Sequence, residues 1–291
     1  MGGDYFKSFD GTEIYYEIRK KSPIMPRVSF IHGQSGGNFT MLQNQIDFVS
    51  DRGCTTLAFD LRGGGRSELM NGRGKEFYSL ENLAKDFIGL LDHTEIEKTN
   101  VVAYSLGTTI ALKAFEIKPE AIDSLTLLHP TYSPFQTTSK RNKFIIQIGL
   151  CAFLENSFSK TFSIINKIRG VKERELFEYK PFVGISDYIN FRYLMTRTPE
   201  ELNSRLNFSN NRLKWGVEKT LLDEIDAPVL CISGSKDIWV LPSAAEEIAQ
   251  RVQDGKVKIF QGHKHDAVYA NPEPINQEIW EFLKSLEKFK I

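Results

Sequence analysis

The sequence predicts an α/β fold, in which a mostly parallel sheet carries helices on both faces. One observation is the alternation of short β-rich runs with segments whose apolar residues recur at helical spacing. The other is size, because 291 residues that are 41% hydrophobic can supply a substantial buried core. Such alternation is typical of a parallel sheet covered on both sides.

The elements follow one another along the chain in that rhythm. A hairpin opens it, with a DGT turn between the runs at 5–9 and 13–20. Further strands are expected at 27–33, 54–60, 100–105, 123–130, 228–234 and 256–262. The helical patterns lie at 39–53, 79–96, 105–120 and 242–255, and a last helix is expected at 274–289.

One connection breaks this rhythm. Between Thr131 and Asp226 no strand is expected over roughly 95 residues, far more than an ordinary crossover needs. Helical patterns fill the segment, at 143–158, 160–170, 186–195 and 199–208. We therefore expect a core formed by 1–131 and 224–291, with a helical cap inserted at 132–223.

Charge and cysteine content exclude several classes of protein. Lys and Arg together number 37, as do Asp and Glu, so nothing favours nucleic-acid binding. Cys54, Cys151 and Cys231 form no CxxC pair and fit buried free thiols in a reducing compartment. The first residues lack a signal-peptide pattern, so we expect a cytoplasmic protein without a membrane span. The excess of basic residues in the cap leaves peripheral membrane contact open.

Ser105 stands in the stretch VVAYSLGTT, where an expected strand ends and a helix begins. Ala103 and Gly107 are small enough for the close approach that such a tight turn imposes. A serine there can present its hydroxyl beside a helix N-terminus, which favours developing negative charge. Serine is also a preferred N-cap residue, so this pentapeptide alone is compatible with a nucleophile or a cap.

Three more motifs follow expected strands and favour the nucleophile. The loop HGQSGG could direct the N–H of Gln34, with that of Leu106, at an oxyanion. The other two are GSKD, containing Asp237, and GHKHD, containing His263 and His265. Serine, acid and histidine in this chain order are expected for a catalytic triad on such a sheet.

Five motifs together make the whole chain resemble cap-bearing α/β-hydrolase fold enzymes, such as monoacylglycerol lipases, carboxylesterases and C–C bond hydrolases. They are HGQSGG, FDLRGGGRS, AYSLG, GSKDIWVLP and HDAVYANPEPIN. The resemblance implies Ser105 as nucleophile, Asp237 as acid and a histidine of the last loop as base. Gly64 departs from the family, which usually has histidine there.

Either histidine of the last loop could be the base. The preceding glycine favours His263, whereas the distance to the Asn-Pro-Glu that follows favours His265. We prefer His265, because the strand end and the downstream helix define the register better than one glycine does.

The expected function is hydrolysis of carboxylic esters of hydrophobic acyl groups through an acyl-enzyme, by a monomer or homodimer without cofactor or metal. We assign substrate contacts to Gly33, Tyr104, Ile238, Trp239 and Val240; cap phenylalanines, Phe144, Phe153, Phe158 and Phe162, could line the cavity. A C–C bond hydrolase, thioesterase or amidase would use the same triad, and a non-catalytic receptor is a further alternative.

The remaining polar candidates have structural interpretations. His93 lies at the C-terminal end of a helix, where a partly charged imidazole favours the helix dipole, and is expected to be structural. His129, at the end of a strand, is expected to be a hydrogen-bonded scaffold residue, with a place near the pocket as the alternative. Asp60 and Arg62 are expected to form an internal ion pair that braces their loop. The histidines near Asp266 lack the motif of a zinc site.

Overall fold

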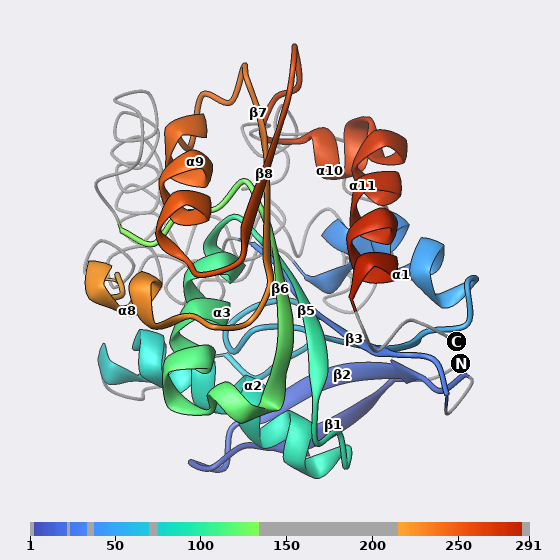
Figure 1. Cartoon of the computed structure of the whole chain (residues 1–291). Coiled ribbons are helices and arrows are strands. Elements are labelled where there is room, and N and C mark those ends of the chain that lie inside the picture. The colour runs from blue at the N-terminus through green and yellow to red at the C-terminus, as the bar shows by residue number, and fades with distance from the viewer. Residues whose placement is uncertain (1–2, 22–23, 34–37, 70–74, 134–214, 287–291) are drawn as a thin grey trace, which may run out of the picture.

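The computed structural model describes residues 3–21, 24–33, 38–69, 75–133 and 215–286, and the α/β prediction is confirmed. Within these ranges the chain forms one eight-stranded sheet with helices on both sides (Figure 1). The strands are β1 (Asp4–Lys7), β2 (Glu13–Arg19), β3 (Arg27–Ile31), β4 (Thr55–Phe59), β5 (Thr99–Tyr104), β6 (Ile122–Leu128), β7 (Val229–Gly234) and β8 (Gly255–Phe260).

The order across the sheet is β1-β2-β4-β3-β5-β6-β7-β8. The expected hairpin is present, and Gly11 has the positive φ of 82° that its turn requires. β2 pairs antiparallel with β1 and β4, whereas the pairs from β4 through β8 are all parallel. The carboxyl ends of six parallel strands therefore meet at one edge of the sheet.

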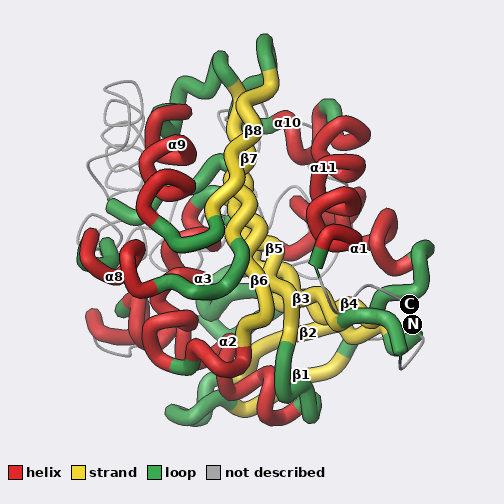
Figure 2. The backbone as a smooth tube through the Cα atoms, viewed as in Figure 1, coloured by secondary structure: helices red, strands yellow, loops and turns green. Residues whose placement is uncertain are grey.

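Alternate residues of the central strands enter two separate hydrophobic cores, because successive side chains of a strand point to opposite faces. In β5, Val101 and Ala103 belong to one core, while Val102 and Tyr104 belong to the other. The first core packs against α2 (Leu80–His93), α3 (Leu106–Ile117), α8 (Lys219–Glu224) and α9 (Pro242–Arg251). The second packs against α1 (Gln43–Ser50), α10 (Ala267–Ala270) and α11 (Pro272–Ser285), as Figure 2 shows.

Local sequence signals explain the helix starts. Ser79 caps α2 by accepting a hydrogen bond from the N–H of Asn82, and α9 and α11 begin with proline. The segment expected as one helix at 39–53 is a 3₁₀ turn, Phe39–Leu42, followed by α1. Two further 3₁₀ turns span Lys75–Tyr78 and Pro119–Ala121, and α10 was not expected.

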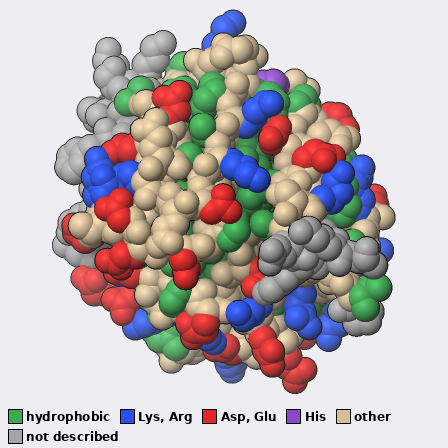
Figure 3. Space-filling view, viewed as in Figure 1, with side chains coloured by type: hydrophobic (Ala, Val, Ile, Leu, Met, Phe, Trp, Pro, Cys, Tyr) green, Lys and Arg blue, Asp and Glu red, His purple; other side chains and the backbone are tan. Residues whose placement is uncertain are grey.

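The expected cap lies largely outside the described residues, as do its phenylalanines and Cys151. The described segments on either side of it meet, since the N–H of Val217 donates to the carbonyl of Tyr132 at 3.0 Å. On the face in Figure 3, acidic and basic side chains are interspersed. None of the described helices is long and apolar enough to cross a membrane.

Candidate active site

Ser105 occupies the sharp turn between β5 and α3. Its φ of 52° and ψ of −117° lie in a region that costs a residue with a side chain on the order of 1–3 kcal/mol. Its N–H donates to the carbonyl of Leu128 at 2.8 Å, which ties the turn to the end of β6. Its hydroxyl makes no N-cap hydrogen bond to α3, so Ser105 stands at the cap position without capping through its side chain.

Gly107 explains why the turn needs small residues. A Cβ at this position would stand 2.3 Å from the carbonyl oxygen of Ile31 and 2.6 Å from that of His32. The first turn of α3 thus lies directly against the segment that follows β3. This contact brings the serine turn and the HGQSGG loop to the same place, as the motifs predict.

His265 and Asp237 form a continuous chain of hydrogen bonds with Ser105. The Nε2 atom of His265 lies 3.0 Å from Ser105 Oγ, and its Nδ1 atom lies 2.7 Å from Asp237 Oδ2. Both residues are buried and follow different strands, β7 for the acid and β8 for the histidine. Three segments far apart in sequence therefore place a hydroxyl, an imidazole and a carboxylate in line.

The carboxylate of Asp237 accepts four hydrogen bonds. Its Oδ1 atom accepts the backbone N–H groups of Trp239 and Val240, at 2.8 and 3.0 Å. Its Oδ2 atom lies 2.7 Å from His265 Nδ1 and 2.8 Å from His129 Nδ1. Burial raises the pKa of Asp237, but the charge of His265 and the bonds from both imidazoles outweigh burial and lower the pKa well below 3.8.

The ionised carboxylate determines the tautomer of His265. An ionised carboxylate can only accept, so the Nδ1 atom facing it must carry the hydrogen. The Nε2 atom of the neutral ring then has a free lone pair that faces Ser105 Oγ. This is the arrangement in which an imidazole can remove a hydroxyl proton.

His263 occupies a different environment. Its Nε2 atom accepts a hydrogen bond from Asn271 Nδ2 at 2.8 Å, and its carbonyl accepts the N–H of Lys236. Gly234 permits this contact, because a Cβ there would stand 2.3 Å from the carbonyl oxygen of His263. Of the two histidines, the structure brings His265 to Ser105.

The first expected oxyanion donor, Gln34, lies outside the described residues, and the second, Leu106, is the first residue of α3. The N–H of Leu106 therefore has no intrahelical carbonyl partner. His32 braces the loop that leads to Gln34: its Nε2 atom accepts the N–H of Leu61, and its Nδ1 atom donates to the carbonyl of Gly33. Burial lowers the pKa of His32 to about 4, which keeps the ring neutral.

The expected substrate contacts divide into two groups. Gly33 packs against the ring of Tyr104, and the hydroxyl of Tyr104 donates to the carbonyl of His265 at 2.9 Å. Tyr104 is only 2% exposed, which places it underneath the histidine. Ile238 is 45% exposed and Val240 is buried, so of these two residues Ile238 has the larger exposed apolar surface beside the acid.

The expected ion pair between Asp60 and Arg62 is not formed. Arg62 is fully buried and pairs with Asp86 of α2 and with Asp10. Asp60 accepts the backbone N–H groups of Phe39 and Arg66 instead, and burial raises its pKa to about 7. The prediction was wrong because it paired neighbours in sequence. Both residues lie in the loop after β4, where the carboxylate of Asp60 bonds to backbone N–H groups and the buried guanidinium of Arg62 reaches carboxylates from other parts of the chain.

The sequence did not predict the contact between His129 and Asp237. His129 follows β6 and was expected to be hydrogen-bonded, but nothing local in sequence names Asp237 as its partner. Ligand atoms of His129, Asp237 and His265 lie within 4.8 Å of one another. The two N···O separations of 2.7 and 2.8 Å are hydrogen-bond distances, shorter than the roughly 3.3 Å between two ligands of one tetrahedral ion.

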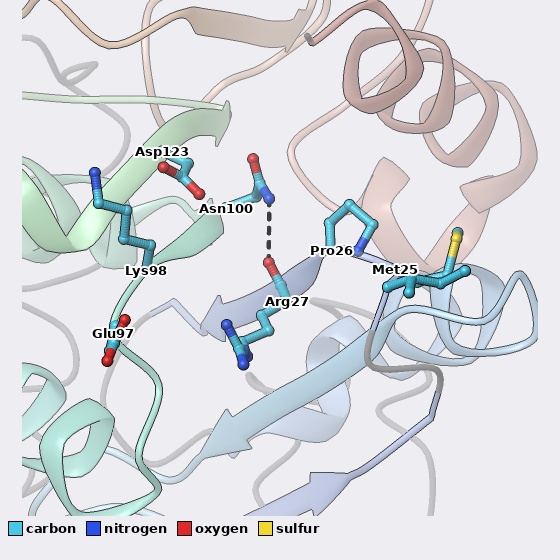
Figure 4. Close-up of a pocket in the computed structure, with 8 residues that line it drawn as sticks. Met25, Pro26, Arg27, Glu97, Lys98, Asn100 and Asp123 are labelled. Atoms are coloured by element: carbon cyan, nitrogen blue, oxygen red, sulfur yellow. Dashed lines mark hydrogen bonds between the residues drawn. The ribbon is translucent and has the colours of Figure 1, made fainter. Parts of the chain in front are cut away.

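A separate pocket of about 280 Å³ lies at the opposite edge of the sheet (Figure 4). Arg27, Asn100 and Asp123 line it from the first residues of β3, β5 and β6, and Glu97 and Lys98 precede β5. The side chain of Asn100 donates to the carbonyl of Arg27 at 3.2 Å. None of the described residues that line this pocket is a serine or a histidine.

Comparison with known proteins agrees with the fold and the motifs. The alpha/beta hydrolase fold family model matches residues 26–148. The uncharacterized hydrolase YugF of Bacillus subtilis is 32% identical over 120 residues, an alignment that spans 41% of either chain. The AB hydrolase superfamily protein YfhM of the same organism is 24% identical over 253 residues, 84% of this chain and 85% of YfhM.

Solved structures show the same fold over nearly the whole chain. An esterase from Exiguobacterium antarcticum superposes with a TM-score of 0.71 at 17% identity, covering 98% of this chain and all of the esterase. A meta-cleavage product hydrolase from Pseudomonas fluorescens gives a TM-score of 0.73 at 18% identity and 97% coverage of both chains. The family model over residues 26–148, the relatives and the solved structures agree in their similarity to α/β hydrolases, and together they support the assignment to that superfamily.

Proposed function

We propose that this protein is a serine hydrolase that cleaves carboxylic esters of hydrophobic acyl groups through an acyl-enzyme. The observation that carries the proposal is the unbroken line of hydrogen bonds from Ser105 Oγ through His265 to Asp237. A free serine hydroxyl is a poor nucleophile, and a positioned base corrects that by taking its proton as the bond to the carbonyl carbon forms.

In the proposed reaction, Ser105 attacks the ester carbonyl while His265 Nε2 takes the hydroxyl proton. Asp237 stays ionised and stabilises the resulting imidazolium. The N–H of Leu106, with that of Gln34 as its proposed partner, would hold the oxyanion of the tetrahedral intermediate. His265 then gives its proton to the departing alcohol, and water repeats the cycle on the acyl-enzyme.

The preference for an apolar acyl group rests on the surroundings of the acid. Ile238 and Leu241 are 45% and 43% exposed and belong to the loop that carries Asp237. Large apolar side chains exposed beside a reactive centre favour an apolar substrate portion. The same acyl transfer serves thioesters, amides and C–C bonds, so these remain alternatives for the bond that is cleaved.

The ester proposal is tested with p-nitrophenyl esters from acetyl to dodecanoyl. We expect a maximum at one chain length and labelling of the protein by a fluorophosphonate, both lost in Ser105→Ala. A matched control is Ser235→Ala, because Ser235 is exposed after β7 and its hydroxyl accepts the N–H of Gly262. Labelling without ester turnover would reject the ester assignment and redirect the search to the alternative bonds.

The inserted helical cap at 132–223 is also part of the proposal. The contact between Tyr132 and Val217 joins the two chain segments that flank 134–214, just after β6, the strand that ends beside Ser105. Replacing 134–214 by a short glycine-rich linker should therefore leave a folded core and abolish the chain-length preference. An unchanged preference would argue against a cap that lines the acyl site.

Location and membrane contact can be tested separately. Cys54 and Cys231 are buried free thiols, which supports a reducing compartment and a cytoplasmic protein. Fractionation of cells checks this. Peripheral contact through the basic cap predicts co-sedimentation with anionic vesicles that is lost at high salt.

A further inference from the structure

His129 stands where β6 reaches the carboxyl edge of the sheet. Its φ is 50°, a left-handed conformation that residues other than glycine seldom adopt. Its N–H donates to the carbonyl of Ile232 at 2.6 Å, which attaches it to β7, and its side chain is 1% exposed. The backbone is thus held in a strained conformation that directs a buried imidazole at Asp237.

The bond from His129 completes the environment of the acid. A carboxylate has about four lone-pair sites, and those of Asp237 are occupied by two backbone N–H groups and two imidazoles. Both imidazoles share Oδ2, so they compete for the negative charge on one oxygen. The strength of the hydrogen bond between His265 Nδ1 and Asp237 must therefore depend on whether His129 also donates to the same oxygen.

We propose that His129 is a positioning residue that fixes the Asp237 carboxylate through its fourth hydrogen bond and thereby weakens the hold of Asp237 on the proton of His265. This inference rests on the proposed function, because it assigns to His265 the role of base. In consequence, His265 stays neutral and able to accept the serine proton to a lower pH than it would beside a carboxylate held by one imidazole.

The surroundings of His129 keep it a neutral donor. Burial lowers its pKa, more than the hydrogen bond to Asp237 raises it. The other titratable groups that act on it are His265, which lowers its pKa, and Asp266, which raises it. The ring of Tyr104 packs edge-on at 6.1 Å. With Nδ1 donating to Asp237, the neutral ring leaves Nε2 as an acceptor, which has no hydrogen-bond partner among the described residues.

The direction of the effect follows from the competition. When the donor at His129 is removed, Asp237 becomes a stronger acceptor and stabilises the imidazolium of His265 more. Protonation then inactivates a larger fraction of the enzyme at low pH, and the acid limb of the activity profile moves to higher pH. Loss of a merely structural contact would lower activity at every pH alike.

The matched variants are His129→Asn and His129→Leu. Asparagine can place its amide N–H near the position of Nδ1 and tolerates a positive φ, whereas leucine has the same branching without a donor. We expect the acid limb of the kcat/KM profile to move up by about 0.5 to 1 pH unit in the leucine variant. This shift corresponds to a loss of about 3- to 10-fold at pH 5.5, against less than about 2-fold at pH 8.5. The asparagine variant should keep the wild-type limb.

Leucine at a positive φ could prevent folding. His129→Gly then replaces it, because glycine removes the donor without a backbone penalty and should move the limb in the same direction. Equal shifts in the asparagine variant and the variant without a donor would overturn the proposal, because the hydrogen bond would not be the cause. An unmoved limb in all variants would also overturn it.

A measurement that needs no turnover separates this inference from the proposed function. Nitrogen NMR of the histidine-labelled protein should find His129 neutral and protonated at Nδ1 at neutral pH. The same titration reports the pKa of His265, which should rise in the variant without a donor. If no ester is hydrolysed, these two results still decide the role of His129. A hydrogen on Nε2 of His129, or an unchanged pKa of His265, would reject it.

Discussion

Polar groups gather at both the amino edge of the sheet, where the parallel strands begin, and the carboxyl edge, where they end, yet the two edges differ in chemistry. At the amino edge, Arg27, Lys98 and Asp123 surround a pocket in which charged side chains of both signs meet. At the carboxyl edge, Ser105 and His129 have positive φ angles; His129 bonds the buried carboxylate of Asp237 directly, and Ser105 is connected to it through His265. Backbone strain alone does not mark the difference, since Glu95 near the amino edge also has a positive φ.

The comparison teaches that reactivity here comes from convergence of strand ends. Parallel strands end at one edge, and each following residue can turn its side chain toward a common centre. β5, β6, β7 and β8 contribute one residue apiece to the hydrogen-bonded cluster of Ser105, His129, Asp237 and His265. At the amino edge the strands begin, and the described charged side chains there line a pocket.

The largest effect expected at the carboxyl edge is that of His265→Ala, with His263→Ala as the matched control. Removal of the proposed triad histidine should lower turnover about 10⁴-fold or more, because Ser105 would lose its proposed base. His263→Ala should change turnover by less than about 10-fold, since that ring bonds Asn271. Steady-state rates on the best p-nitrophenyl ester measure both. The reverse ranking would move the base to His263.

Gly107→Ala tests the close approach between α3 and the segment after β3. The added Cβ would collide with backbone carbonyls that cannot swing away, which should cost about 1–3 kcal/mol of stability. Displacing the Gln34 and Leu106 donors should lower kcat about 10²- to 10³-fold. Denaturant unfolding and kcat are the measurements. Wild-type values in both would contradict the close packing at this glycine.

The pH dependence of stability tests the neutral state of His32. Its folded pKa, about 4, lies below its unfolded value of 6.5, so the unfolded state binds the proton first as the pH falls. This residue therefore contributes stability above pH 6.5 that is lost as the pH falls toward 4. The expected loss is about 1.4 kcal/mol per pH unit within that window.

Unfolding of wild type and His32→Gln from pH 7 to 4 measures this effect. Glutamine can accept the N–H of Leu61 but does not titrate, so the variant should lack one proton's worth of slope. Equal slopes in the two proteins would show that His32 is protonated in the folded state.

The smallest effects are expected at the amino edge. Lys98→Ala and Glu97→Ala remove exposed charges about the pocket of Figure 4 and should change turnover by less than about twofold. Stability should change by about 0.5 kcal/mol or less. A loss of activity above 10-fold would mean that the amino edge is coupled to the reactive cluster and would break the comparison.

Much of the fold follows from local pattern. The runs VVAY and VLCI are apolar because their strands are buried on both faces, and that pattern predicts a strand between two layers of helices. Helix boundaries were less predictable. The last helix was expected to begin at 274, but α11 begins at Pro272, and α10 has only four residues, too few for a helical periodicity.

The candidate site divides in the same way. The sequence by itself determined which polar residues follow the strands: Ser105, Asp237 and the pair His263 and His265. Ser105 could be recognised because the tight turn around it needs small neighbouring residues. The sequence also determined that the chain alternates strands and helices. These features depend on residues that are close together in the chain, and a single sequence shows such residues directly.

Only the tertiary structure decided between partners that are distant in the chain. It brought His265 to Ser105 and sent His263 to Asn271, paired Arg62 with Asp86, and directed His129 at Asp237, 108 residues away. The physical reason is that such contacts depend on the register of the strands and the direction of side chains at their ends. Those are set by the packing of the whole sheet, so no local pattern in the sequence specifies them.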